Sequence, residues 1–326
     1  MLSRIMLLAA AARALTRAPA LKRASTTLCA AAPADDAGPE PAKWLLIDGT
    51  NLIYRSFYGM PSLGSEDAPV GATLGVSNAL LKVALPYAVR GARIVFCLDP
   101  RGKDNWRTAL SPAYKAQRKK APDALYAQMA DSADAAVAFG AAVTKVDGHE
   151  ADDVIATLAA KHAAEGVDVW TGDKDLLQLA AYDGVRVLDA KGAYVDPVAK
   201  FGVEPGQLGD YLALVGDKSD NVEGVRGVGP KAACALLEVF GDLETILAEA
   251  PAADGAVPKR AADAIARADP AAVRVDRRLV GLNEAVPLPE LAFPPFSWPA
   301  LIDHADRFAF ASFRKKVIAA QRKLDP

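Results

Sequence analysis

Three carboxylates occur within four positions near the middle of the chain, at Glu150, Asp152 and Asp153, directly before an apolar stretch. Acidic residues in the first turn of a helix are common, because they suit the positive end of the helix dipole. This structural interpretation and a functional one both remain open for the stretch on its own. On an ideal helix Glu150 and Asp153 share a face that Asp152 does not, so we expect a loop–helix junction here.

Further acidic residues stand where other short runs end. They are Asp48, Asp99, Asp173, Asp175, Asp217 and Asp220. Asp48, Asp99 and Asp173 each end or closely follow an apolar run rich in β-forming residues. In an open α/β sheet, ligands bind beyond the carboxyl ends of the strands. If these strands are parallel neighbours, the three carboxylates converge.

Converging carboxylates call for cations. Two like charges about 4 Å apart repel by roughly 4 kcal/mol at an effective dielectric constant near 20, so such a group holds protons unless cations neutralise it. Oxygen ligands without a set of His or Cys residues select hard cations, Mg²⁺ or Mn²⁺. We therefore predict a carboxylate-lined site for two metal ions about 4 Å apart, which suits phosphodiester cleavage.

The elements that must position these residues alternate between strand and helix up to about residue 195. Apolar runs predict strands at 45–47, 93–98, 141–146, 168–170, 185–188 and 193–195. Helical periodicity predicts helices at 52–58, 71–89 with a bend or end at Pro86, 124–139, 154–164 and 174–181. This order predicts an α/β fold with a central, mostly parallel sheet flanked by helices. From Asp196 onward the pattern is helical, with helices at 205–215 and 232–240.

The segment 100–122 follows Asp99 and is strongly basic. It contains Arg101, Lys103, Arg107, Lys115, Arg118, Lys119 and Lys120 against one acid, Asp104, with Trp106 and Tyr114 interleaved. Basic residues among aromatic ones suit a surface that follows a nucleic-acid backbone and stacks on bases. A solvated basic face is the alternative, but the position directly after a predicted metal ligand favours function.

A glycine-rich turn leads into the predicted helix at 232–240. It contains Gly224, Gly227, Gly229, Pro230 and Lys231. Small residues let backbone N–H groups approach a phosphate at a helix N-terminus, and proline suits the first helical position. A plain helix–turn–helix without a ligand is the alternative. Further along the chain, Phe308, Phe310 and Phe313 are expected to pack in the core.

The first 34 residues differ in composition from the rest of the 326. They carry Arg4, Arg13, Arg17, Lys22 and Arg23, no acidic residue, and many Ala, Ser and Thr. This composition is typical of an organellar transit peptide, and a secretory signal is the alternative. The proline-containing segment 30–42 reads as a linker. We therefore expect residues 1–42 to be a transit peptide and linker, and localisation to a chloroplast or mitochondrion.

Charge and cysteine content restrict the remaining classes. Without the five basic residues of the leader, Lys plus Arg falls from 38 to 33 against 40 Asp plus Glu, a net charge of about −7. That value argues against nucleic-acid binding, but many of the acids are assigned to metals and the basic residues are locally grouped. The three cysteines, Cys29, Cys97 and Cys234, have no zinc-binding spacing. No apolar run is long enough to span a membrane.

Six segments together resemble the 5′-nuclease family, which includes the N-terminal 5′→3′ exonuclease domain of bacterial DNA polymerase I and the flap endonucleases. They are LLIDG at 45–49, LDP with the later YKAQR at 114–118, HEADD at 149–153, TGDKDL at 171–176, GDKSDN at 216–221 and GVRGVGPKAA at 224–233. The resemblance runs from about Lys43 to Lys323, and the order and spacing make it specific. It implies a PIN-like catalytic domain at 43–200 and a helical DNA-binding region at 201–326. His149 and Asn51 depart from the common pattern, but neither removes a carboxylate.

The resemblance also implies roles for particular residues. The first metal group would be Asp48, Asp99, Glu150, Asp152 and Asp153, and the second Asp173, Asp175 and Asp220 with Asp217 nearby. The basic segment 100–122 would form a helical arch over the site, with Lys115 and Arg118 contacting the scissile phosphate. DNA-binding residues would be Arg55, Arg107, Tyr114, Lys119, Lys120, Gly224, Gly227, Gly229 and Lys231. The glycine-rich turn would be a helix–three-turn–helix that grips the duplex backbone together with a K⁺ ion.

The function implied is that of a Mg²⁺- or Mn²⁺-dependent, structure-selective 5′→3′ exonuclease or 5′-flap endonuclease. Its partners would be DNA with free 5′ ends, flaps or nicks, and RNA primers. We expect a stand-alone, monomeric nuclease of organellar replication or repair that needs no membrane. A PIN-like RNase and a non-catalytic DNA-binding module are the alternatives. The arch and the glycine-rich turn count against the first, and the complete set of acids counts against the second.

Overall fold

The computed structural model describes residues 42–60, 63–65, 69–102, 104–252 and 255–325. The predicted transit peptide and linker at 1–42 therefore lie outside the described residues, except for Ala42, and so does Lys103 of the basic segment.

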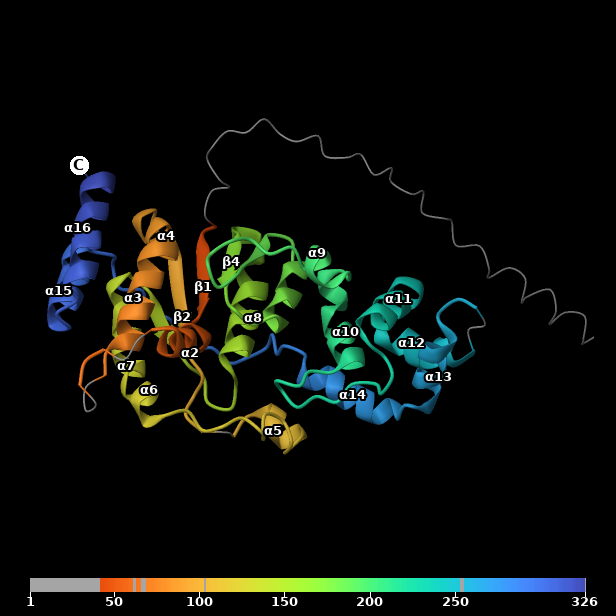
Figure 1. The fold of residues 1–326 in the computed structure, drawn as a ribbon. Coiled ribbons are helices and arrows are strands. Elements are labelled where there is room, and N and C mark those ends of the chain that lie inside the picture. The colour runs from red at the N-terminus through yellow and green to blue at the C-terminus, as the bar shows by residue number, and fades with distance from the viewer. Residues whose placement is uncertain (1–41, 61–62, 66–68, 103, 253–254, 326) are drawn as a thin grey trace, which may run out of the picture. The chain divides into compact units, whose positions relative to one another are not determined.

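A five-stranded parallel sheet lies at the centre of the described chain (Figure 1), with the strand order β3-β2-β1-β4-β5. Its strands are β1 (Trp44–Asp48), β2 (Arg93–Cys97), β3 (Ala142–Thr144), β4 (Val167–Trp170) and β5 (Val185–Leu188). The chain runs outward from β1 to β3 and then returns to β4 on the other side of β1. The carboxyl ends of β1 and β4 therefore flank the point where the strand order reverses, which is where α/β sheets bind ligands. The expected strand at 193–195 is reduced to a single bridge between Leu188 and Tyr194.

Helices cover both faces of this sheet, as the sequence pattern predicts. Leu45 and Ile47 of β1 point to one face and Leu46 to the other, because side chains alternate along a strand, and all three are fully buried. The first face packs against α2 (Gly49–Gly59), α3 (Gly71–Val83), α4 (Leu85–Val89), α6 (Asp123–Ala127) and α7 (Met129–Ala138). The second packs against α8 (Ala151–His162) and the 3₁₀ helix Asp175–Ala181. Pro86 stands in the first turn of α4, so the predicted break in 71–89 is confirmed.

The chain after Asp196 is helical, as predicted. It contains α9 (Pro197–Phe201), α10 (Leu208–Val215), α11 (Pro230–Phe240), α12 (Leu243–Glu249), α13 (Lys259–Arg267), α14 (Pro270–Leu279), α15 (Trp298–Arg307) and α16 (Ala311–Leu324). Short 3₁₀ turns are Ala163–Glu165, Pro205–Gln207 and Ala250–Ala252. Helices α10 to α14 extend the core of the α8 face. Within the described residues, none of the helices is both long and apolar enough to cross a bilayer.

The last two helices return to the other side of the sheet (Figure 1). They pack against α3 and α7, so that residues at opposite ends of the described chain share one core. Phe313 is fully buried there, Phe310 is nearly so, and Phe308 is partly buried against the same cluster. The core role predicted for the three phenylalanines is therefore confirmed.

Among the described residues of the predicted helical arch at 100–122, only α5 (Trp106–Leu110) is helical. Residues 112–117 form successive turns, so the expected helix through this part of the arch is wrong for this structure. Lys115 has φ 52°, which a right-handed helix excludes. The cause is a set of hydrogen bonds to another loop: Lys115 N–H donates to Asp220 O at 3.0 Å, and Asn221 Nδ2 donates to Ala113 O at 2.8 Å.

Candidate active site

The predicted convergence of acids at the carboxyl ends of three neighbouring strands is confirmed. Asp48 is the last residue of β1, Asp99 lies two residues beyond β2, and Asp173 lies three residues beyond β4. Asp48 Oδ1 accepts a hydrogen bond from Asn51 N–H at 3.0 Å, which caps α2, and Oδ2 accepts one from Thr171 Oγ1 at 2.8 Å. These bonds fix the carboxylate where β1 gives way to helix.

Glu150 and Asp152 join this group from the start of α8. Glu150 has extended backbone (φ −77°, ψ 159°) and α8 begins at Ala151, so the predicted loop–helix junction is confirmed. Asp99 Oδ1 accepts a hydrogen bond from Ala151 N–H at 2.7 Å, which places this carboxylate at the positive end of α8. Burial, followed by repulsion from Asp173 and Asp48, raises the pKa of Asp152 well above its ordinary value.

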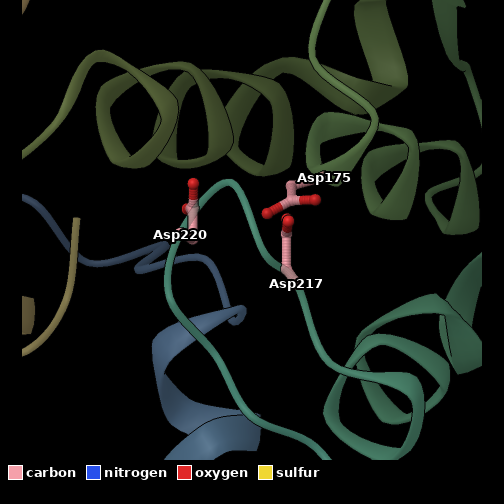
Figure 2. Close-up of side chains that lie close together, drawn as sticks. All are labelled: Asp175, Asp217 and Asp220. Carbon is pink, nitrogen blue, oxygen red and sulfur yellow. The ribbon is translucent and has the colours of Figure 1, made fainter. Parts of the chain in front are cut away.

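A second group of acids comes from two other segments of the chain (Figure 2). Asp175, Asp217 and Asp220 each offer a carboxylate oxygen, and these oxygens all lie within 4.8 Å of one another. Asp175 begins the 3₁₀ helix after β4, whereas Asp217 and Asp220 share the loop after α10. Burial, followed by repulsion from Asp173, raises the pKa of Asp175 to about 8. Lys174 Nζ and Ser219 bond to Asp217 and outweigh its burial, so that the pKa of Asp217 is lowered.

The family pattern places Asp173 in the second group, whereas in this structure it lines the cleft with the first group, and its Oδ1 accepts a hydrogen bond from Asp175 N–H at 3.0 Å. Its charge raises the pKa values of Asp48 and Asp152 on one side and of Asp175 on the other. Burial is the largest cause of the increase at Asp48, whose pKa rises to about 7. The acids thus form one continuous band with Asp173 at its middle.

Asp153 is a correction to the predicted ligand set. Its side chain is fully buried, and it accepts hydrogen bonds from Arg107, Trp106 Nε1 and Asn283 N–H rather than facing the other acids. One turn of helix carries both Asp152 and Asp153, and the 100° rotation between consecutive residues sends them to different sides. The assignment of Asp153 as a metal ligand is therefore wrong for this structure.

Two of the predicted DNA-binding residues are also buried. Arg107 is 2% exposed and forms a bidentate ion pair with Asp153, at 2.8 and 2.9 Å. Tyr114 is 3% exposed, and its hydroxyl lies 2.9 Å from Asp220 Oδ2 and 3.2 Å from Glu150 Oε2. Neither side chain is accessible to a nucleic acid, so both assignments as direct DNA contacts are wrong here.

Lys115 and Arg118 do reach the acidic band, although no helix joins them. Lys115 Nζ lies 2.8 Å from Glu150 Oε2 and 3.7 Å from Asp220 Oδ2, and Arg118 NH2 lies 2.6 Å from Asp220 Oδ1. Both line a cleft of about 790 Å³ that also contains Asp48, Asp99, Asp152 and Asp173. Lys119 and Lys120 lie on the exposed rim of this cleft. The cleft therefore has an acidic floor and a basic edge.

Arg55 lies close to this cleft but is half-buried. Its NH2 donates to Ala190 O at 2.9 Å, which fixes it against the loop after β5. Thr171 and Lys174 hold Asp48 and Asp217 and were not among the predicted site residues. Both lie inside the matched segment TGDKDL, so the signal for them was adjacent to the acids already identified.

The glycine-rich turn leads into α11 as predicted. Gly229 immediately precedes the helix and Pro230 is its first residue. Gly224 and Gly227 have φ values of 69° and 97°, which other residues rarely adopt. Gly224 N–H donates to Asp276 Oδ2 at 2.9 Å, which joins the turn to α14. Gly229 and Lys231 are exposed, so phosphate binding by this turn stays a prediction.

A parallel sheet with acidic residues at its carboxyl edge, followed by a helical region, defines the PIN-like nuclease fold. Residues 43–203 match the family model described as "5′-3′ exonuclease, N-terminal resolvase-like domain", and residues 203–295 match "5′-3′ exonuclease, C-terminal SAM fold". The chain belongs to the 5′-3′ exonuclease family.

Relatives and a solved structure agree with this placement. A 5′-3′ exonuclease of Aquifex aeolicus is 39% identical over 62% of this chain and 71% of that protein. DNA polymerase I of Rhizobium leguminosarum is 34% identical over 84% of this chain, which spans only 28% of that protein. The bacteriophage T5 flap endonuclease in a complex with DNA and metal ions has the same fold, with a TM-score of 0.56, 21% identity, and coverage of 85% of this chain and 98% of that one.

The pKa values of the acidic band predict how stability depends on pH in the absence of metal. Asp48 and Asp175 hold protons up to about pH 7 and 8 in the folded protein, whereas in the unfolded chain they ionise near pH 4. From about pH 4 up to pH 7 and 8, the folded state therefore binds more protons than the unfolded chain does. The free energy of unfolding falls as pH rises through this range. Urea denaturation in EDTA should show lower stability at pH 8 than at pH 5.5.

Asp48→Asn is the matched control, because it removes one of the two titrating groups and should make this pH dependence shallower. Added Mn²⁺ should stabilise the protein more at pH 8 than at pH 5.5, since it must compete with protons. Stability in EDTA that is equal at both pH values would contradict the pKa values given for these two acids.

Proposed function

We propose that this chain is a divalent-metal-dependent 5′ nuclease that cleaves phosphodiester bonds in DNA with a free 5′ end. The observation that carries the proposal is the cleft in which Lys115 and Arg118 face a band of buried carboxylates. A protein that only binds DNA gains nothing from carboxylates that repel phosphate. The relatives named for 5′-3′ exonuclease activity support the same conclusion.

The residues present fit two hard cations, Mg²⁺ or Mn²⁺. Asp48, Asp99, Glu150, Asp152 and Asp173 line the cleft, and Asp175, Asp217 and Asp220 form a separate group, so both groups offer carboxylate oxygens as ligands. Among the described residues, Asp175 Oδ1 is buried without a hydrogen-bond donor, and its ion-pair contact with Lys174 Nζ is long, at 4.0 Å. A buried carboxylate oxygen left in this way suits a cation. When bound, such ions activate water and stabilise charge on the attacking and leaving oxygens.

Residues of the chain itself bind and orient the substrate. Lys115 and Arg118 can exchange their carboxylate partners for the phosphate to be cut, because phosphate suits both cations. Lys119 and Lys120 on the rim add attraction for the neighbouring backbone. Arg55, which lies beside the cleft, adds a positive charge near the DNA strand that enters it. Selectivity then rests on backbone shape and a free 5′ end, since phosphate contacts carry no base sequence.

The glycine-rich turn holds the duplex away from the cut. Gly224 shapes the turn, Gly227 and Gly229 leave room for a phosphate to approach backbone N–H groups at the start of α11, and Lys231 adds charge. A K⁺ ion shared by the turn and the phosphate belongs to this proposal. So do flaps, nicks and RNA-primed ends as substrates, a monomeric protein, and a role in replication, primer removal or repair.

We further propose that the protein acts in an organelle, because its first 34 residues carry five basic residues and no acid. A fusion of residues 1–40 to a fluorescent protein should enter a chloroplast or mitochondrion and be shortened. The matched control replaces Arg4, Arg13, Arg17, Lys22 and Arg23 with glutamine and should stay in the cytosol. Diffuse signal from the unaltered fusion would contradict the targeting role.

Asp173→Ala tests the nuclease proposal most directly, because Asp173 joins the two groups of acids. Cleavage of a 5′-labelled flap DNA with Mg²⁺ should fall by more than about a thousandfold, because the site loses a carboxylate that lies between the two groups. DNA binding measured in Ca²⁺ should persist or tighten, as one repelling charge is lost. Flap RNA and EDTA serve as controls, and full Mg²⁺-dependent cleavage by the variant would refute the metal-site assignment.

Gly229→Asp tests the glycine-rich turn, with Gly229→Ala as its matched control. A β-carbon at Gly229 meets no atom within 4 Å, so both variants should fold normally. The aspartate places a negative charge where a phosphate should bind and should weaken duplex affinity by about tenfold, whereas alanine should change it little. Fluorescence anisotropy with a double-stranded probe in Ca²⁺ measures this, and equal affinities for the two variants would make the turn purely structural.

A further inference from the structure

Arg107 uses its whole hydrogen-bonding capacity inside the protein. Its Nε donates to Leu279 O at 2.9 Å, NH1 lies 2.9 Å from Asp153 Oδ2 and 3.4 Å from Glu150 Oε2, and NH2 donates to Asp153 Oδ1 at 2.8 Å and to Gly281 O at 2.7 Å. A guanidinium has five N–H groups, so each one has a partner. No donor remains for a phosphate, although Arg107 lies in the basic segment of the chain.

Asp153 is saturated in the same way. Besides the two bonds from Arg107, it accepts hydrogen bonds from Trp106 Nε1 at 2.9 Å, Asn283 N–H at 3.0 Å and Glu150 N–H at 3.3 Å. Two carboxylate oxygens offer about four lone-pair positions. These bonds occupy them, so Asp153 has no oxygen free for a metal ion.

The pair joins three segments that are far apart in the chain. Trp106 and Arg107 begin α5, at the base of the segment that carries Lys115 and Arg118. Asp153 lies in the first turn of α8, next to Glu150. Leu279, Gly281 and Asn283 form the end of α14 and the chain after it, and Asp276 of the same helix holds Gly224. The ion pair between Arg107 and Asp153 is thus the point where α5, α8 and α14 meet.

We propose that Arg107 and Asp153 are positioning residues of the nuclease site proposed above. They fix the position of Glu150 relative to α5, which precedes Lys115 in the chain, and they connect both to the end of α14. Neither touches the substrate or a metal ion. This role rests on the proposed function, because it concerns the speed of the same cleavage reaction.

The physical reason is the cost of a buried charge whose partner does not fit. Asp153→Asn puts an NH₂ group where Arg107, Trp106 and Glu150 N–H all donate, and Arg107→Lys leaves carbonyls of Leu279 and Gly281 without a donor. The first turn of α8 and the start of α5 must then shift relative to each other. A misplacement of about 1 Å among reacting groups can slow a reaction on the order of a hundredfold.

Arg107→Lys and Asp153→Asn should therefore slow single-turnover cleavage of flap DNA at saturating enzyme by about tenfold to a hundredfold. Duplex affinity in Ca²⁺ and the stoichiometry and affinity of Mn²⁺ binding, measured by calorimetry, should stay within about twofold of wild type. The double variant should lose no more than the slower single variant, because residues that act as a unit are not additive.

Arg186→Lys is the matched control. Arg186 forms a similar bidentate pair with the fully buried Asp168, at 2.8 and 3.0 Å, but this pair lies between β4 and β5 and away from the carboxyl ends. The Arg186→Lys variant should lower the midpoint of urea unfolding, as Arg107→Lys should, but it should leave the cleavage rate unchanged. Trp106→Phe removes only one hydrogen bond to Asp153, and it replaces Arg107→Lys should that variant fail to fold.

The outcomes separate the competing roles. A loss of Mn²⁺ affinity in Asp153→Asn but not in Arg107→Lys would overturn the proposal and restore Asp153 as a ligand. Wild-type cleavage rates in Arg107→Lys, or in Trp106→Phe where that variant is used, would make the pair merely structural. A wild-type protein that cleaves no flap DNA would instead refute the proposed function, independently of the pair.

Discussion

Mutual repulsion among buried carboxylates is the constraint on which this structure depends. The sheet brings Asp48, Asp99 and Asp173 to one edge, and α8 and the loop after α10 add further acids there. Burial strengthens repulsion because fewer water molecules screen it. Three positive features partly compensate this negative charge. They are the N-terminus of α8, Lys174, and the pair Lys115 and Arg118 in the segment after α5. The same excess of charge makes the edge selective for compact, hard cations.

The acids of this region divide into two kinds that look alike in the sequence. Asp48, Asp99 and Asp152 face the cleft, and burial raises their pKa values. Asp153 faces inward and is neutralised by Arg107. The difference follows from the rotation of one residue along α8. One run of acids therefore contains residues that face the cleft and a residue, Asp153, that supports the structure around them. Their hydrogen-bond partners distinguish the two kinds.

Much of the fold could be predicted from the sequence, because strands and helices alternate with clear apolar runs and Pro86 marks a break. The strand ends also predicted which acids converge. What could not be predicted depends on contacts between distant segments. The turns at 112–117 replace a helix because their backbone bonds to the loop containing Asp220. Arg107 and Tyr114 lie in a basic stretch that contains aromatic residues. Composition alone cannot show that Arg107 donates to the carbonyls of Leu279 and Gly281, or that the Tyr114 hydroxyl contacts the carboxylate of Asp220.

The packing of α15 and α16 against α3 and α7 has a consequence for how the chain folds. Ser77 Oγ and His304 Nε2 lie 2.9 Å apart although 227 residues separate them, and Phe313 completes the core on that face. Contacts of such long range form late, because closing the intervening loop costs entropy before any contact compensates for it. During synthesis, the apolar surface of α3 and α7 that these two helices cover stays exposed until α15 and α16 have been made. A partly synthesised chain with this surface exposed is prone to aggregation until the final helices cover it.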